Sequence, residues 1–192
     1  EETREFIRNY LAPHFGIQKS CEALGISMST YTDIGAQITF GIGSDIHVYG
    51  ECKKLHIGNS VNARSYCNIL MYPDASLIIN DNVFFNNYCS INCLGSIEIG
   101  ENTLFGEAVK IYDHNHEYHN DSDNILRISS NKFSIDPIVI GKNCWIGSNV
   151  TILKGVKIGD NVIIGANCLI YKSIPANSIV KHKEELIIDE SK

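Results

Sequence analysis

The sequence predicts an all-β solenoid, a coil of short parallel strands in which each turn rests on the one before. Three observations between residues 140 and 174 predict it: an aliphatic residue recurs every six positions, glycine often follows it, and a small residue comes four positions later. A period of six fits neither an α-helix nor an alternating strand. Three such hexads make one turn of a parallel β-helix with three flat faces. The aliphatic residues are Ile140, Ile146, Ile152, Ile158, Ile164 and Ile170.

The small position of the repeat also explains most of the cysteines. The chain has seven cysteines and no CxxC pair, which argues against a metal site or a small disulfide scaffold. Cysteine behaves as a small hydrophobe when it is buried in a reduced protein. We therefore expect reduced, buried thiols facing the axis of the coil. The cysteines in the small position are Cys52, Cys67, Cys89, Cys144 and Cys168.

The extent of the repeat predicts the domain organisation. Residues 26–180 form the β-helix, and residues 112–137 interrupt it with a segment rich in Asp, Asn, Ser and His that has no hexad pattern. We expect this segment to leave the coil as a long extruded loop. Residues 1–25 form a connecting segment with a helix over residues 2–11, and residues 181–192 form a polar tail. Short bulges are expected where the register slips, near residues 74–77 and 93–97.

Composition excludes several classes of function. The net charge is −6 with 20% charged residues, whereas a nucleic-acid-binding protein usually has a basic face. No apolar run approaches the ~20 residues of a membrane-spanning helix. The first residues, EETREFIRNYLAPHFG, are polar and unlike a signal peptide. We expect a cytoplasmic protein that neither inserts into a membrane nor binds nucleic acid.

One stretch of the repeat resembles a known family of proteins, namely IVIGKNCWIGSNVTILKGVKIGDNVIIGANCLIYKSIPANSIV. It resembles the left-handed β-helix, hexapeptide-repeat acyltransferases, and most of all the branch of galactoside, maltose and capsule O-acetyltransferases. The resemblance covers about residues 40–180. It implies a bacterial homotrimer with active sites between subunits, acetyl-CoA as co-substrate and no metal. It also implies direct acetyl transfer to a hydroxyl of a sugar or surface polysaccharide, with a capsule that contains sialic acid as the leading acceptor.

The resemblance also implies a catalytic group. His114 follows VKIYD at the point where the chain leaves the coil, and imidazole suits a general base near neutral pH. Asp113 or Glu117 would orient its ring. The backbone N–H of Ser148 is the expected donor to the tetrahedral oxyanion. Trp145, the single tryptophan, should project outward against the pantetheine arm, the acceptor or a neighbouring subunit.

Further positions follow from the family register. Asn86 would hold the acceptor, although it equally suits a coil corner, where asparagine tolerates left-handed backbone. Asp113 and His116 are candidate acceptor contacts, and His116 and His119 equally suit a solvated loop. Near Lys181 the chain departs from the family, whose members often continue with Gly-x-Pro-Ala, so the adenine contacts stay open. The residues expected to bind the cofactor are Trp145, Gly147, Ser148, Ala166, Tyr171, Lys172, Lys181 and Lys183.

Two rival functions use the same coil. An N-acetyltransferase acting on an amino sugar nucleotide would need the same donor and base. A zinc protein like the γ-type carbonic anhydrases would need three histidines. His114 and His119 have the spacing of two such ligands, but Ile78 occupies the region where the third should lie. A non-catalytic coil used only for assembly is the remaining alternative.

Overall fold

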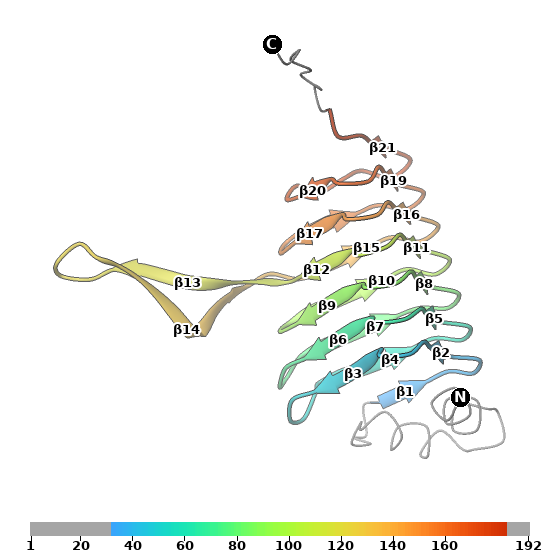
Figure 1. The fold of residues 1–192 in the computed structure, drawn as a ribbon, viewed down its shortest axis with the longest axis horizontal. Helices are drawn as coiled ribbons and strands as arrows, with labels where there is room; N and C mark the ends of the chain where they lie inside the picture. The colour runs from blue at the N-terminus through green and yellow to red at the C-terminus, as the bar shows by residue number, and fades with distance from the viewer. Residues whose placement is uncertain (1–31, 184–192) are drawn as a thin grey trace, which may run out of the picture.

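The computed structural model of the chain describes residues 32–183. The expected helix over residues 2–11 and the last part of the tail lie outside the described residues. The described chain winds into a triangular column from which a single hairpin projects (Figure 1). This confirms the predicted β-helix.

Three parallel sheets form the flat faces of the column, and each coil supplies one strand to each sheet. Sheet A contains β1 (Thr32–Ile34), β4 (Lys54–Ile57), β7 (Ser76–Ile79), β10 (Ser96–Ile99), β15 (Ile138–Ile140) and β18 (Lys157–Ile158). Sheet B contains β2 (Thr39–Phe40), β5 (Asn62–Ala63), β8 (Phe84–Phe85), β11 (Leu104–Phe105), β16 (Trp145–Ile146), β19 (Ile163–Ile164) and β21 (Ile179–Val180). Sheet C contains β3 (Asp45–Val48), β6 (Asn68–Met71), β9 (Ser90–Cys93), β12 (Lys110–Tyr112), β17 (Thr151–Leu153) and β20 (Leu169–Ile170).

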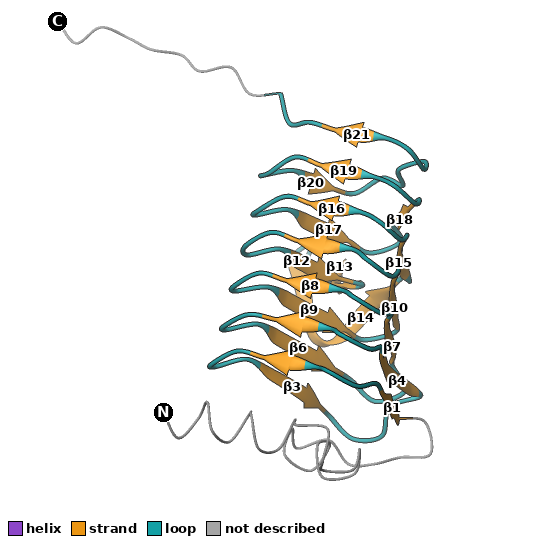
Figure 2. Ribbon diagram, turned by 90° about the vertical axis from the view of Figure 1, so that its right-hand side faces the viewer, coloured by secondary structure: helices purple, strands orange, loops and turns teal. Residues whose placement is uncertain are grey.

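The winding of the coil is left-handed. In Figure 2 the strands of sheet B cross the front toward the left, sheet C returns behind them, and sheet A closes the triangle at the right. The chain climbs from the N-terminal to the C-terminal end as it makes this circuit. The handedness therefore agrees with the one that the sequence resemblance implied.

The repeat positions occupy the places that the period of six predicts. The aliphatic residues of the last coils are at most 5% exposed, and the small residues after them are equally buried, among them Cys144 and Val162. In the middle coils Phe85 and Phe105 stack along the axis with ring centroids 4.8 Å apart. Ile174, at the end of the repeat, is partly buried. A continuous apolar core thus runs the length of the column.

The corner between sheets A and B is held by a ladder of asparagines. Each has a positive φ of 55–60°, a conformation that asparagine tolerates better than most residues. Their side-chain amides also hydrogen-bond from coil to coil, with N···O distances of 3.0–3.4 Å. The corner residue therefore fits the turn and links consecutive coils. The ladder consists of Asn82, Asn102, Asn143, Asn161 and Asn177.

The two expected slips of register appear as corners of different length between sheets C and A. Residues 72–75 separate β6 from β7, and Asp74 there has φ of 62°. Only Leu94 and Gly95 separate β9 from β10. The shorter corner is closed by a side chain from the next coil, which belongs to the candidate site.

The extruded segment is more ordered than the loop that the sequence predicted. β13 (His114–Asn120) and β14 (Leu126–Ile135) pair as an antiparallel hairpin, with an irregularity between His116 and Tyr118. The hairpin leaves one edge of the column between β12 and β15 (Figure 1). Between residues 32 and 183 no helix is long and apolar enough to cross a membrane.

The buried thiols give a test of the core. Six cysteines of the described chain are free and buried, namely Cys52, Cys67, Cys89, Cys93, Cys144 and Cys168. The Cys67 thiol and burial raise the pKa of the Cys89 thiol, and burial together with the charge of Asp113 raises the pKa of Cys93. A Cys21→Ser variant, which leaves these six, should show no fast reaction with a thiol reagent in the native state and six thiols in denaturant. Rapid labelling of the native variant would contradict the axial placement.

Candidate active site

His114 stands at the point where the chain leaves the column. It is separated from β12 by Asp113 alone and begins β13, and its side chain is only 15% exposed. Its Nδ1 lies 3.3 Å from Oδ1 of Asp113, and the edge of its ring meets Phe133 with centroids 5.4 Å apart and planes 89° apart. With Nδ1 engaged by the carboxylate, Nε2 is the nitrogen left for a substrate. A partly shielded imidazole held from two sides has the properties of a positioned base.

Asp113 is a wholly buried carboxylate that closes the short corner of the coil below. Its oxygens accept hydrogen bonds from the backbone N–H groups of Leu94, Gly95 and Ser96, at 2.7–3.2 Å. A buried carboxylate is tolerated when several donors satisfy it in this way. The side chain is 0% exposed, and this burial does not support the predicted contact of Asp113 with the acceptor. Of the two predicted orienting groups, Asp113 is in contact with His114, while Glu117 lies exposed on β13.

The hairpin forms a recess beside His114. Asn115, His116, Glu117, Tyr118, Ser134 and Lys154 line it. Nδ1 of His116 lies 2.8 Å from the carbonyl oxygen of Ser129, which fixes its ring within the hairpin, and Lys154 forms an ion pair with Asp136 at the base of β14. His116 thus lines the recess, while His119 lies farther out, opposite Arg127. Among residues 32–183 no three His, Cys, Asp or Glu side chains come together as a metal site requires.

Three of the residues predicted to bind the cofactor, Gly147, Ser148 and Ala166, line a different corner of the column. Gly147 and Ser148 follow β16 at the corner between sheets B and C, and Ala166 follows β19 one coil above. A Cβ on Gly147 would lie 2.6 Å from the backbone nitrogen of Ala166, so the close stacking of the coils requires glycine there. Trp145 is 56% exposed and points outward. Its outward neighbours on adjacent strands are Leu104 and Ile163.

Ser148 has a backbone donor that the fold leaves unused. One coil below, the N–H of Glu107 donates to Oγ of Ser148 at 3.2 Å, and in the coil below that the N–H of Asn87 donates to Oδ1 of Asn86. Within residues 32–183 the N–H of Ser148 itself has no acceptor in hydrogen-bonding geometry. An unpaired N–H at a corner is available to a ligand oxygen.

The other predicted positions divide between the two corners. Asn86 is half-buried at the B–C corner and accepts from Asn87, and its backbone is not left-handed, since the positive φ falls on Tyr88. Lys181 stacks on Gly165 at the same corner, and Lys183 follows it. Tyr171 and Lys172 follow β20 at the C–A corner, with Nζ of Lys172 5.5 Å from the ring centroid of Tyr171.

One protomer does not bring the base and the oxyanion donor together. Ser148 precedes strand β17, whereas His114 follows strand β12, which pairs with β17 in parallel. The two residues therefore lie at opposite ends of sheet C, roughly 15–20 Å apart at about 3.3 Å per strand residue. Figure 1 shows the hairpin at one edge of the column and β16 at the other.

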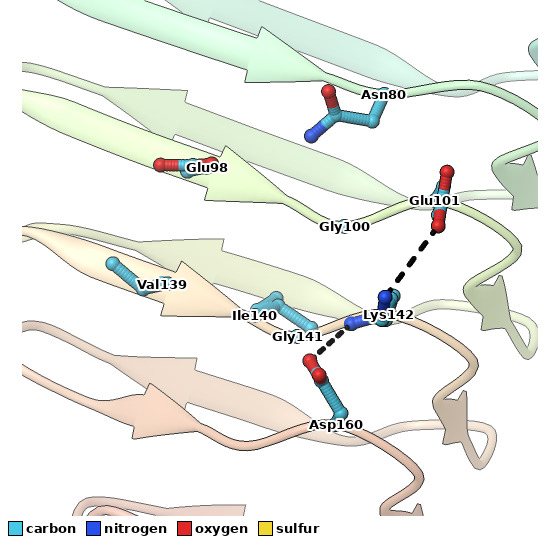
Figure 3. Close-up of a pocket in the computed structure, with 9 residues that line it drawn as sticks. All are labelled: Asn80, Glu98, Gly100, Glu101, Val139, Ile140, Gly141, Lys142 and Asp160. Carbon is cyan, nitrogen blue, oxygen red and sulfur yellow. Dashed lines mark hydrogen bonds and ion pairs between the residues drawn. The ribbon is translucent and has the colours of Figure 1, made fainter.

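A second recess lies on the face of sheet A and is unrelated to this constellation. Figure 3 shows its charged side chains, with Nζ of Lys142 3.9 Å from Oε1 of Glu101 and the backbone N–H of Lys142 donating to Asp160 at 3.0 Å. Lys142 thus engages two of the three carboxylates, those of Glu101 and Asp160. The recess also contains no imidazole or other nucleophilic group.

Comparison with known proteins agrees with the fold and the repeat. Residues 137–172 match the family model described as bacterial transferase hexapeptide (six repeats). The chain is 37% identical over 108 residues to an Escherichia coli protein provisionally named as the lipopolysaccharide biosynthesis O-acetyl transferase WbbJ, covering 54% of this chain and 55% of that one. It is 29% identical over 136 residues to one provisionally named as the E. coli colanic acid biosynthesis acetyltransferase WcaF, covering 70% of this chain and 68% of the other. The galactoside O-acetyltransferase of E. coli is 36% identical over 84 residues, covering 44% and 39%.

The fold also matches solved structures. The mutant N-acyltransferase AntD from Bacillus cereus, in complex with an amino sugar nucleotide and coenzyme A, has a TM-score of 0.65 at 18% identity, covering 84% of this chain and 82% of that one. The resemblance to hexapeptide-repeat transferases that the sequence predicted is confirmed. The chain spans about half the length of the first curated relatives that it matches, 55% of one and 46% of another.

The buried carboxylate yields a stability prediction. Asp113→Asn keeps the shape of the side chain but replaces one acceptor oxygen with an N–H donor that faces backbone N–H groups. We expect the free energy of unfolding to fall by about 3 kcal/mol, the scale for breaking a buried charged network. Denaturant titration at one protein concentration measures it. The matched control Glu117→Gln, on the exposed face of the hairpin, should change the value by less than about 0.5 kcal/mol, and equal effects of the two variants would contradict the assigned role.

Proposed function

We propose that the protein is an acetyl-CoA-dependent O-acetyltransferase that acts on a hydroxyl of a sugar or a bacterial surface polysaccharide. The observation that carries the proposal is that the two ends of sheet C present the two groups that acyl transfer needs: a shielded imidazole, His114, and an unused backbone N–H, Ser148. The names of the relatives, which are acetyltransferases of lipopolysaccharide, colanic acid and galactosides, support the choice of donor and acceptor class.

The chemistry proceeds by direct transfer in a ternary complex. Nε2 of His114 takes the proton of the acceptor hydroxyl as its oxygen attacks the thioester carbonyl. The oxyanion of the tetrahedral intermediate receives the N–H of Ser148. Collapse of the intermediate breaks the C–S bond, and the imidazolium returns the proton to the sulfur of coenzyme A. The thioester has a good leaving group, so no covalent enzyme intermediate is required.

The arrangement works only between protomers. In a homotrimer, the C–A corner of one column would face the B–C corner of the next. Such heterologous contacts form a closed ring when the rotation between protomers closes. His114, Tyr171 and Lys172 would then lie opposite Ser148, Ala166 and Lys181 of a neighbour. The apolar row around Trp145 supplies exposed surface for the donor arm or for the neighbour.

The cofactor would lie along the C-terminal coils. Ala166 is exposed and small, and it leaves room beside the B–C corner, while the exposed Lys172, Lys181 and Lys183 supply cations for phosphate groups. The free, buried thiols suit the reducing cytoplasm, where acetyl-CoA is made. A capsule that contains sialic acid is the acceptor that we would test first.

Removal of the base gives the first test of activity. His114→Ala should lower the rate of acetyl transfer by about 10²–10⁴, the usual contribution of a general base. The rate is measured as coenzyme A release with a panel of sugars and capsular oligosaccharides. His56→Gln, which alters the histidine paired with Asp33 in the first coils, is the control and should keep the wild-type rate. A His114→Ala rate near wild type would disprove the assignment.

The same assay distinguishes an ester from an amide. An O-acetyl product is released by mild base, whereas an N-acetyl product survives it. We expect complete release from the isolated product, and a base-stable product would support transfer to an amino sugar.

A mixing experiment tests whether the site is shared. Ala166→Trp should block the donor groove, and His114→Ala removes the base, so each variant alone is inactive. Co-refolded mixtures of the two should regain activity, because some interfaces pair an intact His114 with an intact Ala166. If the mixture stays as inactive as its components, both groups act from one protomer and the shared site is wrong.

A further inference from the structure

We propose that the rings of His47, Tyr49, Tyr72 and Phe133 form a strip that binds an extended glycan and leads it to His114. The inference rests on the proposed function and deepens it: the acceptor is a chain of several sugar units, and the units beyond the one acetylated lie along the N-terminal coils. Aromatic rings with polar tips suit carbohydrates, because ring faces cover the apolar faces of sugars while the tips bond their hydroxyls.

The rings form an unbroken series at the C–A edge of the column. His47 and Tyr49 have centroids 4.3 Å apart, Tyr49 and Tyr72 5.1 Å, and Tyr72 and Phe133 6.4 Å. Phe133 then meets His114 at 5.4 Å. These residues come from three separate parts of the chain, namely β3 with the corner after it, the corner after β6, and the hairpin strand β14, yet each ring lies next to the following one. The series ends on the imidazole that the proposed chemistry uses.

The strip lies outside the core of the coil. Met71, which precedes Tyr72, faces the axis and is fully buried, whereas Tyr49 is 45% exposed and His47 is exposed. In the next coil the position in register with Tyr72 is Leu94, which is buried in the short corner. The repeat therefore does not require a tyrosine at these positions. Tyr72 and Phe133 are half-buried. A row of aromatic rings that reaches the surface of a rigid scaffold usually marks a binding surface.

The direction of the strip agrees with the needs of the reaction. The predicted donor contacts, Ser148, Ala166, Tyr171 and Lys172, all belong to coils C-terminal to His114. The strip occupies the coils N-terminal to it. A donor arriving from one end of the column and an acceptor from the other would meet at the imidazole without competing for the same surface.

Tyr49 separates this role from simple packing. Phe133 and Tyr72 also hold the hairpin against the column, so their loss would disturb several functions at once. Among residues 32–183, Tyr49 has ring contacts with His47 and Tyr72 and with no ring of the hairpin. A structural role would make Tyr49→Ala equal in its effect on short and long acceptors, whereas a glycan strip makes the effect grow with acceptor length.

The experiment compares wild type, Tyr49→Ala and the ring-preserving Tyr49→Phe on oligomers of sialic acid, N-acetylglucosamine and maltose, each from monomer to hexamer. For the acceptor that wild type prefers, we expect KM to fall as the oligomer lengthens. Tyr49→Ala should raise KM about 3- to 10-fold for the hexamer, the loss of one aromatic contact, and leave the monomer and kcat unchanged. Tyr49→Phe should restore most of the affinity.

Saturation-transfer NMR of the hexamers, recorded with protein in the absence of acetyl-CoA, measures binding without any reaction. Binding that Tyr49→Ala weakens, in a protein that transfers no acetyl group, would retain the strip and reject the proposed function. Acetyl transfer with equal KM for monomer and hexamer in wild type and Tyr49→Ala would reject the strip and retain the function. Two further results would overturn the strip. One is that no hexamer binds. The other is that the Tyr49→Ala protein forms a smaller oligomer, which would make the rings a contact between copies of the chain.

Discussion

The constraint on which the structure depends is that each coil must hydrogen-bond in register to the coils above and below it. The parallel ladders of three sheets leave no freedom to shift a strand by one residue, because a shift would turn the buried aliphatic row outward. Glycine at Gly147 and the asparagine ladder both follow from this close stacking. The column is therefore rigid, and any group attached to one corner keeps a fixed height and direction.

The coil is interrupted at residues that are not part of the six-residue repeat. Where the chain leaves the column, the stack of coils lacks one corner. The buried carboxylate of Asp113 takes the place of that corner by accepting hydrogen bonds from three N–H groups of the coil below. The adjacent residue, His114, is thereby attached to the rigid part of the molecule although it begins the hairpin. A base on a protruding hairpin without such an anchor would lose much of the orientation that general-base catalysis requires.

The sequence predicted the fold almost completely and the site in part. The hexads determine which residues face the axis, so burial of Ile146 or Cys144 followed from spacing alone. The role of Asp113 did not follow, because its partners lie about one coil earlier and become neighbours only through the register of the stack. The hairpin was missed as well, since its apolar residues, such as Ile128 and Phe133, are spaced irregularly around a bulge. A strand pattern broken by one extra residue looks like a loop to any test of alternation.

The triangular cross-section also explains why a single chain is an incomplete enzyme on the proposed function. A prism with a filled core has no internal cavity, so reactive groups can converge only on its outer surface. Groups at two corners of one prism point away from each other, and only a neighbouring prism can turn one corner toward another. In the proposed trimer the cleft between two such columns would be long and straight, open at both ends along the axis. A linear polymer fits that shape better than a compact small molecule does, because each further unit finds the same wall. The row of rings from His47 to Phe133 would give the proposed cleft a surface on which successive sugars could rest.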